Sequence, residues 1–128
     1  MPKRNAFESE LVTAALALLQ LNEFVAFRVN NTGVFDPKRR VFRSFRGRKG
    51  VSDIIAIGRG FKDGDSDNAG ECFGRIICIE CKTIKGVVSA DQKAFLRDIE
   101  VNGGVALVIR CLDDLSGDLR ELGYFIRD

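Results

Sequence analysis

Apolar and polar positions follow two different periods along this 128-residue chain, and the periods predict its helices and strands. Apolar side chains recur at helical spacing in three segments, so helices are expected over Phe7–Leu21, Ala90–Val101 and Asp113–Leu122. Ser89 stands directly before the second segment and is a suitable N-cap, because its hydroxyl can accept a hydrogen bond from the first turn.

Runs rich in β-branched and aromatic residues predict strands at Phe24–Asn30, Ser52–Ile57, Arg75–Lys82, Val105–Cys111 and Tyr124–Ile126. The main elements therefore follow the order helix, strand, strand, strand, helix, strand. Three strands in succession can form an antiparallel meander, whereas a helical crossover makes the strands on either side of it parallel. The pattern predicts one α/β domain over residues 1–128 with a mixed sheet.

Two segments between the strands have no clear period. Phe35–Gly50 is strongly basic but contains Val41, Phe42 and Phe45, which can anchor it. Gly58–Gly74 is rich in glycine and acidic residues and is expected to be a hairpin insertion with a solvated tip.

Positive charge is concentrated in the first of these segments, although the formal net charge is only +2. No acidic residue separates its seven cations, which are Lys38, Arg39, Arg40, Arg43, Arg46, Arg48 and Lys49. Such a cluster favours a polyanion as partner, and the alternative is a solvated loop. Arg28 and Asn30 share one face of the first predicted strand, where they either contact DNA or are simply solvated.

The chain contains no histidine, which excludes Ser-His-Asp triads, Cys-His pairs and zinc sites that use histidine. Cys78 and Cys81 have zinc-like spacing, but residues three apart on a strand face opposite sides, so small buried side chains are expected instead. No apolar run approaches the length of a membrane span, and the expected compartment is the cytoplasm.

Asp53, Glu80 and Lys82 are the strongest candidates for chemistry. Asp53 opens one apolar strand, and Glu80 and Lys82 end the next, on one face with Cα atoms about 6.6 Å apart. Carboxylates from two paired strands beside an ammonium group can hold a Mg²⁺ ion and a phosphate. Individually the three residues could be an exposed ion pair and a capping aspartate, but together they favour a site.

These residues resemble the PD-(D/E)xK nuclease signature, with Ser52-Asp53 in place of Pro-Asp. The wider pattern resembles the VRR-NUC (virus-type replication-repair nuclease) family of that superfamily, of the stand-alone phage or bacterial type. It comprises the motifs Arg28–Gly33, Gly50–Asp53, Glu80–Thr83 and Ser89–Leu96, in this order. The resemblance implies a restriction-endonuclease-like core with α-β-β-β-α-β order.

The resemblance also implies roles for individual residues. Asp53 and Glu80 would be ligands of Mg²⁺ or Mn²⁺, together with the backbone carbonyl of Cys81. Lys82 would be the catalytic lysine, and Gln92 resembles a glutamine that the family keeps near its site.

An acidic residue in the first helix resembles an accessory glutamate of the family, and two residues compete for this role. Glu8 is preferred to Glu10 because it lies on the same helical side as Leu11 and Leu18.

We therefore expect a metal-dependent endonuclease that cuts branched DNA as a homodimer, with a four-way (Holliday) junction as its leading substrate. It would act in the cytoplasm, which is the host's if a phage encodes it, and no membrane is expected as a partner. The alternatives are a restriction-like nuclease that cuts plain duplex, an inactive DNA-binding module, and a dimeric domain whose sheet edge pairs with a partner.

Overall fold

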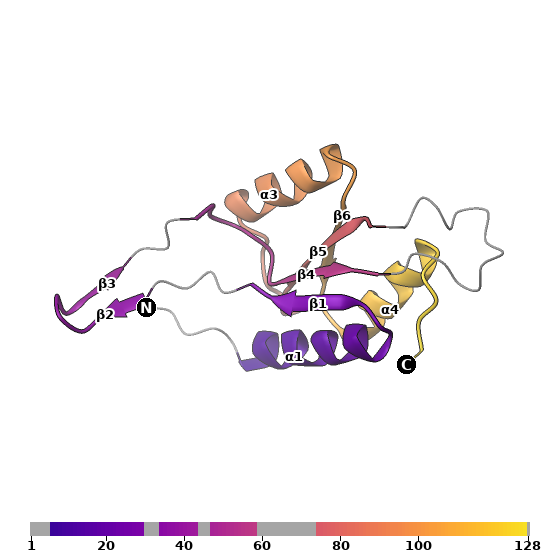
Figure 1. The fold of residues 1–128 in the computed structure, drawn as a ribbon, viewed down its shortest axis with the longest axis horizontal. Helices are drawn as coiled ribbons and strands as arrows, with labels where there is room; N and C mark the ends of the chain where they lie inside the picture. Colours follow the sequence, from indigo (N-terminus) through magenta and orange to yellow (C-terminus); the bar gives the residue numbers. More distant parts are fainter. Residues whose placement is uncertain (1–5, 30–33, 44–46, 59–73, 128) are drawn as a thin grey trace.

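The computed structural model describes residues 6–29, 34–43, 47–58 and 74–127 (Figure 1). Its elements are α1 (Ala6–Leu21), β1 (Val25–Arg28), β2 (Val34–Asp36), β3 (Val41–Arg43), β4 (Ile54–Ile57), β5 (Ile76–Cys81), α3 (Ala90–Val101), β6 (Val105–Ile109) and α4 (Leu112–Glu121). Most of the predicted Gly58–Gly74 insertion lies outside the described residues, as do Asn30 and Arg46.

Four strands form a mixed sheet in the order β1-β4-β5-β6. The pairs β1–β4 and β4–β5 are antiparallel, whereas β5 and β6 are parallel and are connected by α3. The predicted meander, the helical crossover and the mixed α/β fold are therefore confirmed.

Helices cover both faces of this sheet (Figure 1). On one face, α1 and α4 pack on residues that include Ile54, Ile77, Ile79 and Cys81. On the other face, Phe95 and Leu96 of α3 pack around Cys78. The alternation along β5 agrees with the predicted division of its side chains, and it places Glu80 on the face that α3 covers.

The basic segment contains a hairpin that the sequence did not predict. The antiparallel strands β2 and β3 pair Val34 with Arg43, and Figure 1 shows the hairpin lying apart from the four-stranded sheet. Each strand has only three residues, too few for alternation to be recognised. At its turn, Arg40 has a φ of 53°, in the left-handed region.

The predicted strand at Tyr124–Ile126 is wrong, because this segment joins no sheet. Tyr124 and Ile126 are buried in the core beneath α1 and α4. The segment is held by side chains rather than by a neighbouring strand. Arg120 donates to the Ile126 carbonyl at 2.9 Å, and Asn22 accepts from the Arg127 N–H at 2.6 Å.

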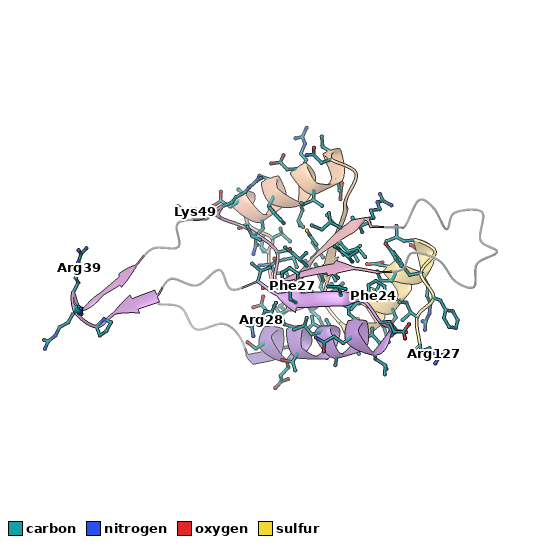
Figure 2. All side chains as sticks on the ribbon, viewed as in Figure 1. Phe24, Phe27, Arg28, Arg39, Lys49 and Arg127 are labelled. Atoms are coloured by element: carbon teal, nitrogen blue, oxygen red, sulfur yellow. The ribbon has the colours of Figure 1, made fainter. Side chains whose placement is uncertain are left out.

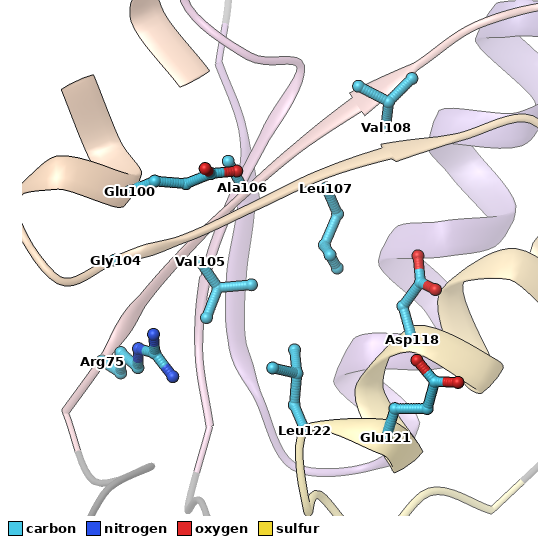
Figure 3. Close-up of a pocket in the computed structure, with 10 residues that line it drawn as sticks. All are labelled: Arg75, Glu100, Gly104, Val105, Ala106, Leu107, Val108, Asp118, Glu121 and Leu122. Carbon is cyan, nitrogen blue, oxygen red and sulfur yellow. The ribbon is translucent and has the colours of Figure 1, made fainter. Parts of the chain in front are cut away.

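β6 forms one edge of the sheet, and an open depression of about 650 Å³ lies along it (Figure 3). Its acidic lining residues are Glu100 of α3 with Asp118 and Glu121 of α4, and Arg75 lies among them. Among the described residues, no helix is long and apolar enough to span a membrane.

Candidate active site

Asp53 and Glu80 face each other across the β4–β5 pair. The register pairs Ile54 with Ile79, and one further step places Asp53 opposite Glu80 on the same face of the sheet. Both carboxylates are buried, with 9% of Asp53 and 4% of Glu80 exposed. Burying two carboxylates side by side is unfavourable without compensating donors or cations, so the surroundings of this pair are informative.

Backbone hydrogen bonds fix Asp53 between its two neighbouring strands. Its Oδ2 accepts from the Cys81 N–H at 2.8 Å, and its carbonyl accepts from the Val29 N–H at 2.8 Å. In a strand, the N–H and C=O of one residue point toward the same neighbour. The carbonyl of Cys81 therefore faces the Asp53 side, as its predicted role as a metal ligand requires.

Glu80 contacts both Lys82 and Gln92 through one carboxylate oxygen. Its Oε1 lies 3.7 Å from Nζ of Lys82 and accepts a hydrogen bond from Nε2 of Gln92 at 2.9 Å. Lys82 is itself largely buried, with 13% of its side chain exposed. The structure thus brings the sequence-predicted residues Asp53, Glu80, Lys82 and Gln92 together.

The start of α3 fixes the orientation of the Gln92 amide. Ser89 and Gln92 form a capping box: the Gln92 N–H donates to Ser89 Oγ at 3.1 Å, and the Ser89 N–H donates to Gln92 Oε1 at 2.9 Å. Because Oε1 is occupied as an acceptor, the Nε2 donors are left for Glu80. Gln92 therefore belongs both to the helix cap and to the site.

The segment before Asp53 packs directly on α3. Gly50 has a φ of 80°, and a Cβ at this position would lie 2.3 Å from the Asp91 carbonyl carbon and 2.6 Å from the Gln92 nitrogen. Two residues earlier, Arg48 forms a 2.6 Å ion pair with Asp98, and its guanidinium carbon lies 5.4 Å from the centre of the Phe95 ring. These contacts connect Asp53 to the helix that carries Gln92.

Ser52 replaces the proline of the resembled signature and is fully buried. Its hydroxyl donates to the Ile54 carbonyl at 3.2 Å. Burial raises the pKa of the Cys78 thiol, and a hydrogen bond with Ser52 opposes this shift only in part. Cys78 therefore stays a protonated, inert core residue, as the sequence analysis expected.

The donors at this site fit a hard divalent cation. Two carboxylates and a backbone carbonyl are the ligands that Mg²⁺ uses when it keeps several waters. Among the described residues, no group of three or more His, Cys, Asp or Glu side chains is placed to hold a metal ion. Glu8 is half-buried on the core-facing side of α1, and Glu10 is exposed. Neither residue forms a three-carboxylate group with Asp53 and Glu80.

The predicted DNA-contacting cations lie in three places. Lys38, Arg39 and Arg40 are exposed at the turn of the β2–β3 hairpin, and Arg43 is in β3. Lys49 is exposed near α3, as Figure 2 shows. Arg28 is exposed at the end of β1, but its pairing with Ile54 places it on the α1 face, opposite Glu80.

Two residues that the sequence pattern did not indicate, Arg110 and Asp98, hold this region together. Arg110 donates to the carbonyls of Thr83, Ile84 and Gly86 at 2.5, 3.2 and 2.8 Å, which fixes the loop after Lys82. Asp98 forms an ion pair with Arg48, which lies 50 residues earlier in the sequence. Neither contact has a local signal, since each depends on the tertiary fold.

The site is an ammonium group and two carboxylates at the carboxyl end of β5. It can bind a hard cation and place a phosphate oxygen near Lys82. The acidic depression along β6 is a separate feature, because none of the four site residues lines it.

Neither a family model nor a curated protein matches this sequence. A solved structure described as a VRR_NUC domain protein is similar over 96% of this chain and 95% of its own, with a TM-score of 0.58 and 17% identity. The chain has the fold of a VRR_NUC domain protein. The similarity extends over nearly the whole VRR_NUC chain, and it confirms the fold that the motifs predicted.

Proposed function

We propose that this protein is a metal-dependent endonuclease that hydrolyses phosphodiester bonds in branched DNA. The observation that carries the proposal is the buried pair Asp53–Glu80, with Lys82 3.7 Å from Glu80, at the end of a strand pair. Similarity to a VRR_NUC domain protein supports a nuclease rather than another hydrolase.

Each site residue has a distinct role in the proposed reaction. Asp53, Glu80 and the Cys81 carbonyl would hold Mg²⁺ or Mn²⁺. When bound, the cation supplies positive charge to the scissile phosphate and lowers the pKa of water. Gln92 orients Glu80 through its Nε2 hydrogen bond.

Lys82 supplies a second positive charge beside the phosphate. Attack of water forms a new P–O bond while the P–O bond to one sugar oxygen breaks, and that oxygen leaves as a hydroxyl group after taking up a proton from solvent. Additional negative charge on the phosphate oxygens during this step is stabilised by the ammonium group. The ion pair with Glu80 holds Nζ in position, and the small exposed fraction of Lys82 strengthens the interaction by limiting screening.

The exposed cationic side chains would bind the phosphate backbone of DNA. Lys38, Arg39 and Arg40 at the hairpin turn would contact backbone phosphates away from the site, and Lys49 and Arg28 would contact them closer to it. Such contacts are independent of sequence and sensitive to salt. A four-way junction is two-fold symmetric, so two matching cuts require a homodimer with two sites.

The experiment that tests this proposal compares substrates of matched sequence. Labelled four-way junction, flap, splayed arm, duplex and single strand are incubated with Mg²⁺ or Mn²⁺ and the wild-type protein. Symmetric nicking of the junction is the expected result. Cutting of duplex at a fixed sequence would indicate a restriction-like enzyme, and binding without cleavage in either metal would indicate a DNA-binding module.

Two variants assign any cleavage to this site. Asp53→Asn and Lys82→Ala are expected to lose cleavage while they retain junction binding, because the binding cations lie elsewhere. Lys93→Ala is the matched control, since it removes an exposed lysine one residue from Gln92 without touching the site. Wild-type rates in either site variant would overturn the assignment.

A further inference from the structure

The loop between Lys82 and α3 presents two aliphatic side chains to solvent. Ile84 and Val87 are each 79% exposed, and no other large hydrophobic residue in the described parts of the chain is more exposed. A partner that covers both side chains would remove this apolar surface from water, which favours binding.

Hydrogen bonds hold the backbone of this loop, and the Ile84 and Val87 side chains project from it into solvent. Arg110 donates to three of its carbonyls, and the Gly86 N–H closes a turn on the Thr83 carbonyl at 3.0 Å. At one end, the Lys82 N–H donates to Ile109 of β6 at 2.9 Å. At the other, Val88 packs into the core around Cys78. The backbone that carries Ile84 and Val87 therefore has a fixed position beside Lys82.

The position of the loop ties it to the site. Ile84 follows Lys82 by two residues, so their Cα atoms lie at most about 7 Å apart. Val87 precedes Ser89, whose hydroxyl caps α3 at Gln92. Lys85 lies between the two apolar residues and is exposed, so a cation accompanies them.

We propose that Ile84 and Val87 form an apolar wedge that packs on unstacked bases of DNA next to the scissile phosphate. Apolar side chains are used in this way to enter disturbed base steps, while a neighbouring lysine meets the phosphate. Stacked bases of continuous duplex offer no such surface, whereas bases at a branch point do. The wedge thus makes the site selective for DNA with interrupted stacking, and this inference rests on the proposed nuclease function.

The first test measures binding without any metal. A junction carries 2-aminopurine at the branch point, where its fluorescence reports the stacking and the packing environment of the base. The probe is mixed with wild-type protein and with the double variant Ile84→Ser/Val87→Ser. We expect the fluorescence change to be lost in the double variant. An unchanged signal would overturn the wedge, whether or not the wild-type protein cleaves DNA.

The second test measures selectivity as the ratio of branched to duplex cleavage rates in Mn²⁺. Loss of the wedge is expected to lower this ratio about tenfold. Val101→Ser is the matched control, because Val101 is 75% exposed at the far end of α3, and its ratio is expected to equal that of the wild type. An equal fall of both rates in the double variant would overturn the proposal.

Two further measurements separate the wedge from other roles of the loop. Arg110→Ala keeps both apolar side chains but releases the loop carbonyls, so it is expected to lower the ratio by an intermediate factor. Light scattering determines the mass of the double variant. A smaller mass than that of the wild type would mean that these side chains join two copies of the chain, which would overturn the wedge. Failure of the wild-type protein to cleave any substrate counts against the proposed nuclease alone.

Discussion

Gln92 donates from Nε2 to Oε1 of Glu80 at 2.9 Å while its own Oε1 accepts from the N-cap of its helix at 2.9 Å. One amide group therefore completes the capping box and donates a hydrogen bond to the buried Glu80 carboxylate. Glutamate serves a capping box as well as glutamine does, but it cannot donate to Glu80. The two roles can be separated by a single substitution.

Gln92→Glu is expected to retain the helix and to lose activity. The capping hydrogen bond survives, while a carboxylate replaces the donor beside Glu80, so cleavage should fall at least about tenfold, as for loss of one hydrogen bond to a charged group. Initial cleavage rates at saturating Mg²⁺ and the midpoint of thermal unfolding measure the two effects. A large loss of stability at unchanged rate would show that only the cap matters.

Gly50→Ala should disrupt the packing of the Asp53 segment on α3. A methyl group would meet the Asp91 and Gln92 backbone at 2.3 to 2.6 Å, and the φ of 80° adds strain. We expect a destabilisation of about 3 kcal/mol or more, with loss of cleavage. Gly103→Ala is the control, because its φ of 88° is similar but nothing lies within 4 Å of the added carbon. It should cost only about 1 kcal/mol, and equal unfolding free energies in urea would refute the close packing at Gly50.

Arg48→Ala is expected to loosen the same segment more mildly. The ion pair with Asp98 is exposed and stacking on Phe95 adds little, so a loss of about 1 kcal/mol is expected together with a higher Mg²⁺ requirement for cleavage. Arg97→Ala removes an exposed arginine from α3, the helix that carries Asp98 and Phe95. It should leave both the stability and the Mg²⁺ requirement near those of the wild type. If Arg48→Ala leaves the stability unchanged but weakens DNA binding in a salt-sensitive way, Arg48 contacts DNA instead.

Asp118→Asn should stabilise the protein at neutral pH. Burial, followed by repulsion from Asp114 and Glu121, raises the pKa of Asp118. The folded state therefore binds this proton more tightly than the unfolded state, and the stability linked to it is lost as pH rises through the folded pKa. The gain from the variant should be below about 1 kcal/mol at pH 7 and should vanish in acid.

Denaturant unfolding at a series of pH values checks this prediction. Asp113→Asn serves as the control on the same helix. Asp113 lies in the first turn of α4, where negative charge is favourable, so its loss should be neutral or slightly destabilising at pH 7. A gain from Asp118→Asn that persists in acid would exclude titration of this carboxylate as its cause.

Local signals in the sequence were sufficient for much of the fold. The predicted bounds of α3, Ala90–Val101 with Ser89 as the N-cap, are confirmed, because caps are decided by neighbouring residues. Alternation along β5 likewise placed Glu80 on the face opposite Ile79.

Features that depend on distant partners were not predictable. Tyr124–Ile126 has the composition of a strand, but it pairs with no strand. Packing in the core and side-chain hydrogen bonds hold it instead. The contacts of Arg48 with Asp98 and of Arg110 with the loop after Lys82 join segments far apart in the sequence. The expected pairing of the two strands already placed Asp53 near Glu80. The hydrogen bond from the Cys81 N–H to Asp53, by contrast, could be seen only in the structure.

The acidic depression along β6 bears on how this protein behaves in concentrated solution. An open edge strand is a template on which a strand of another molecule can add and start aggregation. Here Glu100, Asp118 and Glu121 line the depression beside that edge, so their negative charge repels an incoming acidic strand. The safeguard weakens as these groups take up protons, and the raised pKa of Asp118 lets this carboxyl group take up its proton at a higher pH than an ordinary aspartate. Acidic buffers therefore weaken the protection of the sheet edge, and purification is best kept near neutral pH.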